Sequence, residues 1–118
     1  MKKIEAIIRP HKLDELLKAL TQSDALTESS ALGVTVLDTV GFGRQKGHSE
    51  VYRGVEQEMG LVPKRMLIMY VSDDQVDSVV TLICDVAQTG KFGDGKIAVL
   101  PVENLTRIRT GEEGHPAL

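Results

Sequence analysis

The sequence Met66-Leu67-Ile68-Met69-Tyr70-Val71-Ser72-Asp73-Asp74-Gln75 joins a strand pattern to a helix start. Its first six residues are apolar or aromatic, which predicts a buried strand over 66–71. Ser72 followed three residues later by Gln75 is the pattern of a capping box, which marks a helix N-terminus. An apolar stripe at helical spacing follows, at Val76, Val79, Val80 and Ile83.

Further strands and a second helix are predicted on both sides of this stretch. Leucines at helical spacing predict the helix, at Leu13, Leu16, Leu17 and Leu20. The strands are predicted over Lys3–Ile8, Val34–Val40, Ile97–Leu100 and, as a short fifth one, Arg107–Thr110. Residues 111–118 are expected to be a frayed end. Two right-handed βαβ units with both helices on one sheet face predict a single ferredoxin-like domain of the α+β class over 1–118.

The strand over 66–71 is apolar on both faces, and the strand over 97–100 repeats this pattern. Two helices cover only one face of a four-stranded sheet, and a face in contact with water normally carries polar side chains at alternate positions. The second face is therefore expected to be covered, most simply by another subunit.

The composition argues against several classes of function. A net charge of −3 argues against nucleic-acid binding through a basic surface. No apolar run approaches membrane-spanning length, and Met1–Ile4 carries no signal-peptide pattern. The single cysteine, Cys84, excludes an intrachain disulfide framework and fits a reducing, cytoplasmic compartment.

Two glycine clusters predict anion binding. Gly41-Phe42-Gly43-Arg44-Gln45-Lys46-Gly47-His48 opens a long loop, and its glycines leave N–H groups uncovered beside two cations. Gly90–Lys96 has the spacing of a phosphate-binding P-loop, but Ile97 replaces the Mg²⁺-binding hydroxyl, and the segment follows a helix instead of a strand. A P-loop NTPase is therefore rejected, although this cluster can still hold phosphates. Glycine-rich loops without a ligand are the alternative interpretation.

A pair of arginines gives a third indication. In an extended segment, Arg107 and Arg109 leave the same face, and two adjacent guanidinium groups suit a bound anion. The alternative is a surface pair matched by Glu103, Glu112 or Glu113.

Together these motifs resemble those of the PII signal-transduction proteins. The resemblance covers essentially the whole chain and is carried by Met1–Pro10, Gly41–His48, Tyr52-Arg53-Gly54, Thr89–Lys96 and Arg107–Glu112. It implies a homotrimer of ferredoxin-like subunits that binds ATP or ADP between subunits, with Mg²⁺ accompanying ATP and 2-oxoglutarate as effector. It also implies a T-loop over 43–63 that contacts target proteins, a B-loop over 89–96, and a C-loop and tail over 107–118.

The resemblance assigns roles to individual residues. Nucleotide binding is expected from Gly33, Thr35, Gly43, Arg44, Gln45, Tyr70, Gly93, Asp94, Gly95, Lys96, Arg107 and Arg109, the last two from the neighbouring subunit. 2-Oxoglutarate is expected at Gln45, Lys46, Gly47 and Lys64, with the Gln45 side-chain oxygen on Mg²⁺. Contacts with partner proteins are expected from Phe42, Arg53 and Glu56.

The chain departs from the family pattern in its loops. Gln57 stands where the family carries a uridylylated tyrosine, and Val55 where some members carry a phosphorylated serine, so neither modification is expected there. The loop over 57–62 also departs from the usual run. The connection over 23–32 is longer than usual and lies just before the strand expected near the adenine.

The expected function is a non-catalytic regulator of nitrogen metabolism whose T-loop changes conformation with its ligands. Its target is expected to be an enzyme, a regulator or a transporter, and a transporter would bring indirect membrane association. No nucleic-acid partner is expected. The alternatives are a divergent PII-like regulator that senses adenine nucleotides and another metabolite for a transporter or a carbon-linked operon, a slow nucleotide hydrolase, and a purely structural trimer.

Overall fold

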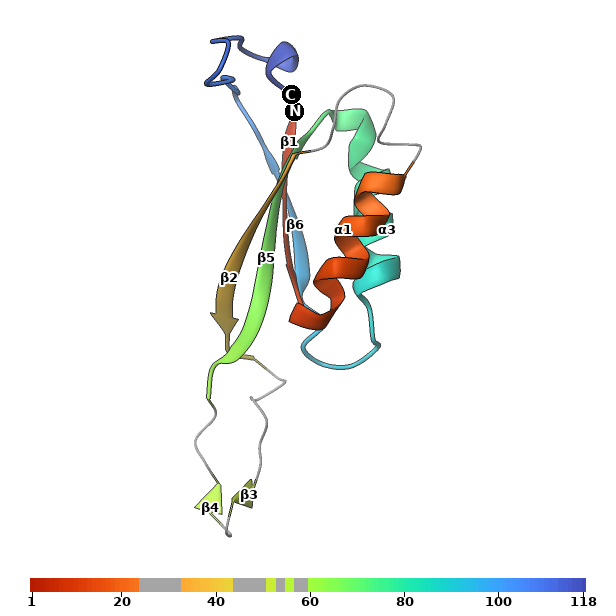
Figure 1. The fold of residues 1–118 in the computed structure, drawn as a ribbon, viewed down its shortest axis with the longest axis vertical. Coiled ribbons are helices and arrows are strands. Elements are labelled where there is room, and N and C mark those ends of the chain that lie inside the picture. Colours follow the sequence, from red (N-terminus) through yellow and green to blue (C-terminus); the bar gives the residue numbers. More distant parts are fainter. Residues whose placement is uncertain (24–32, 44–50, 53–54, 57–59) are drawn as a thin grey trace.

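The computed structural model describes residues 1–23, 33–43, 51–52, 55–56 and 60–118. Its main sheet is antiparallel, with the order β2-β5-β1-β6, and consists of β1 (Lys2–Ile8), β2 (Val34–Gly41), β5 (Val62–Val71) and β6 (Lys96–Pro101). The helices α1 (Leu13–Gln22) and α3 (Val76–Ala87) cover the same face of this sheet (Figure 1). The predicted ferredoxin-like α+β fold is therefore confirmed.

Local sequence explains where the helices begin. Pro10 cannot continue the ladder of β1, and it starts the short 3-10 helix η1 (Pro10–Lys12) that leads into α1. The predicted capping box is present, because the Ser72 N–H donates to Gln75 Oε1 at 3.2 Å. A 3-10 turn, η2 (Asp73–Gln75), separates this cap from α3.

The hydrophobic core lies between the sheet and the two helices. Its buried side chains come from alternate positions of β1 and β5 and from one face of each helix: Ile4, Ala6, Ile8, Leu16, Leu20, Leu67, Met69, Val71, Val79, Ile83 and Ala87. This pattern follows from the period of two along a strand and the apolar stripes of the helices. The predicted helix stripes are confirmed.

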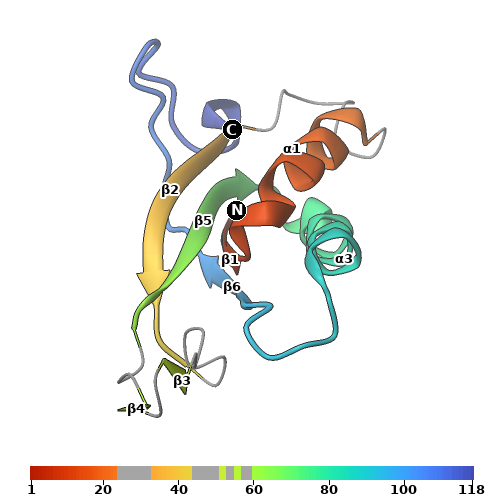
Figure 2. The same ribbon diagram turned by 60° about the horizontal axis from the view of Figure 1, so that its bottom comes forward.

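Among the described residues, no helix covers the opposite face of the sheet (Figure 2). Cross-strand pairing places Leu37, Met66 and Ile7 side by side on this face, and Ile68 lies one pair further along. Leu37 is 41% and Tyr70 43% exposed. β5 is thus apolar on both sides, as predicted, and this largely apolar face, which also carries the Lys3–Glu5 ion pair of β1, is in contact with water.

β5 is longer than predicted, because it begins at Val62 instead of Met66. The long loop was expected to extend to residue 63, so Val62 and Pro63 were assigned to it. In the structure β1 reaches only as far as Arg65, so this part of β5 pairs with β2 alone. Pro63 therefore occupies an effective edge position, where a missing donor is tolerated.

The long loop contains paired strands that the sequence did not predict. β3 (Val51–Tyr52) and β4 (Val55–Glu56) form a small antiparallel hairpin at the far end of the molecule (Figure 1). Several expected features lie outside the described residues: those at Arg44, Gln45, Lys46, Gly47, Arg53 and Gln57, and the long connection over 24–32.

The prediction of a fifth strand over Arg107–Thr110 is wrong. The chain reverses there: the Gly111 N–H donates to the Arg107 carbonyl at 2.7 Å, and Thr106 bridges to Glu113. Gly111 makes this possible with φ +72°, a conformation that favours glycine. The two arginines therefore do not project from one strand face, because the segment is a turn.

The expectation of a frayed end is also wrong. Residues 111–118 fold back along the preceding segment and finish in the 3-10 helix η3 (His115–Ala117). The Gly114 N–H donates to the Leu105 carbonyl at 2.9 Å, and Arg107 Nη2 donates to the Leu118 oxygen at 2.7 Å. These contacts tie the tail to the end of the sheet.

Candidate functional site

The two glycine clusters meet at one cavity of about 690 Å³, at the end of the sheet where β2 ends and β6 begins. It is lined by Ile7, Gly41, Phe42, Gly43, Val62, Lys64, Phe92, Gly93, Gly95 and Lys96. The lining combines exposed glycine backbone, two lysines and an apolar wall. An anionic group attached to a less polar body suits such a surface.

Backbone geometry explains the glycines of the second cluster. Gly95 has φ +100°, and a Cβ built there would lie 1.6 Å from the Ile7 carbonyl oxygen. Only glycine fits so close to another strand in this conformation. Gly93 also has a positive φ, +99°. These glycines let the loop over 88–95 pass directly against the end of β1.

Lys64 is buried at the wall of this cavity, with 7% of its surface exposed. Its Nζ donates to the Gly93 carbonyl, which links β5 to the second glycine cluster. Burial, together with the nearby Arg9 cation, lowers the pKa of the Lys64 ammonium. A lysine at this wall can attract an anion into the cavity.

The side chain of Asp94 organises the loop from within. Its Oδ1 accepts from Thr89 Oγ1 at 2.5 Å and Arg9 Nε at 3.0 Å. Its Oδ2 accepts from the backbone N–H groups of Thr89 at 2.7 Å and Gly90 at 2.9 Å. The hydrogen bonds, first of all that from the Thr89 hydroxyl, hold the pKa of this carboxyl well below its usual range.

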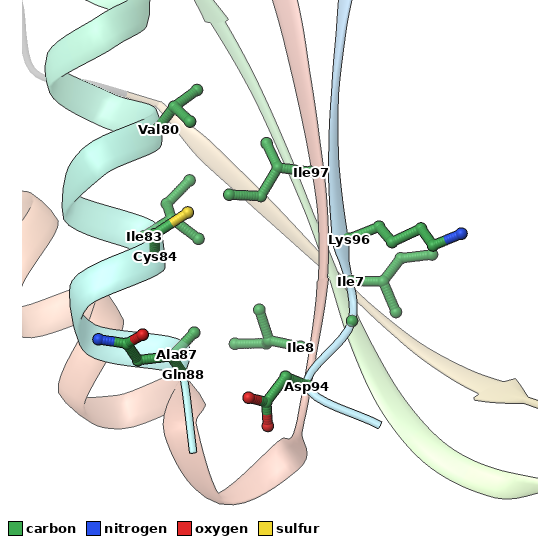
Figure 3. A pocket seen from close by; sticks show the side chains of 11 residues that line it. Ile7, Ile8, Val80, Ile83, Cys84, Ala87, Gln88, Asp94, Lys96 and Ile97 are labelled. Atoms are coloured by element: carbon green, nitrogen blue, oxygen red, sulfur yellow. The ribbon is translucent and has the colours of Figure 1, made fainter. Parts of the chain in front are cut away.

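A second cavity, of about 370 Å³, lies on the helix side of the same loop. It is bounded mainly by apolar side chains of α3, β1 and β6, with Cys84 and Gln88 at its wall (Figure 3). Figure 3 shows the Asp94 carboxylate turned toward α3 and the Lys96 side chain turned away from it. The Asp94 carboxylate and the Lys96 ammonium thus point to opposite sides.

The remaining predicted nucleotide ligands within the described residues lie at the other end of the sheet. Thr35 and Tyr70 lie near the start of β2 and the end of β5, where the tail also lies (Figure 1). From Thr35 to Gly43 the chain advances about 26 Å, at roughly 3.3 Å per strand residue. One protomer therefore does not bring Gly33, Thr35, Tyr70, Arg107 and Arg109 to the cavity that Gly43, Gly93, Gly95 and Lys96 line.

The predicted partner contacts lie at the base of the long loop and beyond it. Phe42 is 61% exposed at the mouth of the cavity, as a contact residue would be. Glu56 lies in β4, far from the sheet (Figure 1). Neither position by itself tests a role in partner binding.

Sequence reasoning missed Arg9 as part of this site. Its Nη2 donates to the Phe92 carbonyl at 2.6 Å in addition to the bond to Asp94. The available signal was the position of Arg9 between a strand and Pro10, where the β1 strand ends. That signal gives no partner, because Arg9 and Asp94 are distant in sequence.

Within the described parts of the chain, no cluster of three or more His, Cys, Asp or Glu side chains could hold a metal ion. The described helices include none that is long and apolar enough to cross a membrane.

Comparison with known proteins identifies the family. The family model for nitrogen regulatory protein P-II matches residues 1–112. Over the full length of both chains, this chain is 49% identical to the nitrogen regulatory protein P-II of Pasteurella multocida and 50% identical to that of Klebsiella oxytoca. It is also 50% identical to the nitrogen regulatory protein P-II 1 of Escherichia coli strain K12. With its ferredoxin-like fold and two converging glycine clusters, the chain belongs to the nitrogen regulatory protein P-II family.

Proposed function

We propose that this chain is a non-catalytic sensor that binds ATP and ADP, with Mg²⁺ accompanying ATP, and that 2-oxoglutarate binds beside the nucleotide. Membership of a family of nitrogen regulatory proteins supports a role in signal transduction. The observation that carries the ligand proposal is the cavity where Lys64, Lys96 and the two glycine clusters converge. Glycine backbone and lysines are the groups that hold phosphates and carboxylates.

The proposal includes a homotrimer. One largely apolar face of the sheet has no helix of the described residues over it, and burying such a face against other copies is favourable. The predicted ligands lie at opposite ends of each protomer, so a complete site needs the cavity of one copy and the turn at Arg107 of another. A ring of head-to-tail contacts satisfies both requirements.

In this proposal the ligand acts through the base of the long loop. Gly41 and Phe42 line the cavity and lead directly into that loop, so a ligand in the cavity favours some loop conformations over others. ATP and ADP shift the loop only by the difference in their affinities for its conformations. The loop would then bind or release a target protein, either an enzyme, a regulator or a transporter.

Isothermal titration calorimetry tests the ligand proposal. ATP and ADP are titrated into the protein with and without Mg²⁺, and 2-oxoglutarate is then titrated into the ATP–Mg²⁺ complex. We expect saturable binding of both nucleotides and binding of 2-oxoglutarate only when ATP and Mg²⁺ are present. Absence of nucleotide binding would overturn the proposed function.

A second candidate is a regulator that senses adenine nucleotides together with another metabolite. It is favoured by the loop sequence, because Gln57 replaces the modifiable tyrosine and the loop over 57–62 departs from the usual run. Nucleotide binding without any response to 2-oxoglutarate would select this candidate. A turnover assay with ATP in the same samples would reveal the alternative of a slow hydrolase.

A further inference from the structure

Arg9, which directly follows β1, binds two residues of the loop over 88–95 and reaches a third through Asp94. Its Nε bonds Asp94, its Nη2 bonds the Phe92 carbonyl, and Asp94 in turn holds Thr89. The side chain of Arg9 is only 15% exposed, so this guanidinium is largely committed to the loop. The shape of the loop therefore depends on a residue outside it.

Arg9 itself does not line the cavity that Lys64 and Lys96 line. Asp94 lines the other, helix-side cavity and not the cationic one, its neighbour Gly93 lines only the cationic cavity, and Gly95 lines both. Figure 3 shows the same division, with Asp94 pointing toward α3 and Lys96 pointing away. The Asp94 carboxylate is thus kept on the side of the sheet end opposite to the Lys96 ammonium.

This separation matters for an anionic ligand. A carboxylate turned into the cavity would repel a phosphate strongly at contact distance, because local solvent screening there is weak. The four hydrogen bonds of Asp94 use all of its acceptor sites and hold its carboxylate away from the cavity. Arg9 supplies the only one of the four that comes from outside the loop.

We propose that Arg9 is a positioning residue of the anion site: by binding Asp94 and the Phe92 carbonyl, it keeps the carboxylate on the α3 side and the glycine backbone toward the cavity. The proposal rests on the proposed binding of nucleotide. It differs from a direct role, in which the Arg9 guanidinium would contact the phosphates.

The test measures ATP affinity by calorimetry for four variants: Arg9→Gln, Arg9→Lys, Asp94→Asn and the double variant Arg9→Gln/Asp94→Asn. The matched controls are Arg65→Gln and Asp38→Asn. Arg65 Nε lies 3.0 Å from Asp38 Oδ1, the same distance as in the Arg9–Asp94 pair, but neither residue lines the cavity. Thermal unfolding of every variant shows whether it is folded at the temperature of the titration.

If Arg9 acts through Asp94, Arg9→Gln and Asp94→Asn each weaken ATP binding by about fivefold to tenfold. The double variant then binds ATP with no lower affinity than the single variant that has the lower affinity of the two. Arg9→Lys keeps a cation for Asp94 and recovers most of the affinity. The Arg65 and Asp38 controls bind ATP as the unmodified protein does, even where their stability is reduced.

Three other outcomes would overturn the proposal. Unchanged ATP affinity in Arg9→Gln would show that the loop needs no support from Arg9. Weaker binding in Arg9→Gln with tighter binding in Asp94→Asn would show that both residues act directly by their charge. Equal losses in the Arg65 control would assign the effect to general stability. If the unmodified protein binds no ATP, the proposed function itself fails, which is a separate result.

Discussion

Arg107 Nη1 lies 3.2 Å from Glu112 Oε1, and the Nη2 of the same guanidinium donates to the Leu118 oxygen at 2.7 Å. The residue expected to bind phosphate is thus held by acceptors of its own tail. A carboxylate beside an arginine competes with any phosphate for the same donors. Both side chains are partly exposed, so the contact is weak enough to be exchanged for a ligand.

Glu112→Gln is therefore expected to tighten ATP binding by about twofold to fivefold, the range that corresponds to loss of one exposed ion pair. The measurement is the dissociation constant for ATP. Glu113→Gln is the matched control, because it removes the same charge from the neighbouring position and should leave the affinity nearly unchanged. Weaker ATP binding in Glu112→Gln would mean that Glu112 orients Arg107 for the ligand instead of competing with it.

Arg107→Ala combined with Arg109→Ala is expected to weaken ATP and ADP binding by roughly tenfold or more, since each lost bond to a charged group is worth about 1.5–3 kcal/mol. The trimer should survive, which light scattering coupled to size-exclusion chromatography measures. Unchanged nucleotide affinity would refute the anion role of the pair. Loss of the trimer would instead assign the two arginines to subunit contacts.

A substitution on the uncovered sheet face tests whether this face forms the subunit contacts. Ile68→Glu places a second carboxylate beside Glu5 on this face and should convert the proposed trimer to monomers, because burying a further charge there costs several kcal/mol. Glu15→Gln on the exposed side of α1 is the control, and light scattering gives the mass of both. A trimer that persists in Ile68→Glu would show that assembly uses another surface.

Gly95→Ala is expected to destabilise the fold by at least about 2 kcal/mol, since a Cβ there overlaps the Ile7 carbonyl oxygen and φ is +100°. Gly33→Ala is the control, because no atom lies within 4 Å of a Cβ built at Gly33. Urea unfolding monitored by circular dichroism gives both free energies. Equal stability of the two variants would contradict the close approach of the loop to β1.

Asp94 predicts how stability depends on pH. Its pKa is lower in the folded than in the unfolded chain, so its contribution is complete above about pH 4, the ordinary value of an Asp carboxyl, and is lost as the pH falls toward the folded value. Asp94→Asn should therefore be less stable than the unmodified protein at pH 7, and the difference should shrink below pH 4. A difference that stays constant down to pH 2.5 would exclude this linkage.

Periodicity and caps were enough to predict the fold. The apolar stripe that contains Val79 and Ile83, and the strand patterns on both sides, specify a βαβ–βαβ order, because helices and strands repeat at different intervals. The two-sided apolar pattern of 66–71 also showed that one sheet face needs a cover. These are properties of short segments, so the sequence of each segment is enough to show them.

The turn at Arg107 could not be predicted from periodicity. Alternation of Arg107, Ile108 and Arg109 fits a strand, and only the hydrogen bond from Gly111 to the Arg107 carbonyl shows that the segment reverses. Likewise, the sequence did not show that β5 begins at Val62, where it pairs with β2 alone. Both errors concern segments whose hydrogen-bond partners the sequence does not specify.

By itself, then, the sequence determined the order of elements, the family resemblance and the residue types available for anion binding. Only the tertiary structure decided which of them share a space. It placed Gly43 and Gly93 at the same cavity and directed the Asp94 side chain away from Lys96. It also brought Arg9, which follows β1, into contact with Asp94. The physical reason is that glycine clusters and charges carry no local period, so their partners are set by the packing of distant segments.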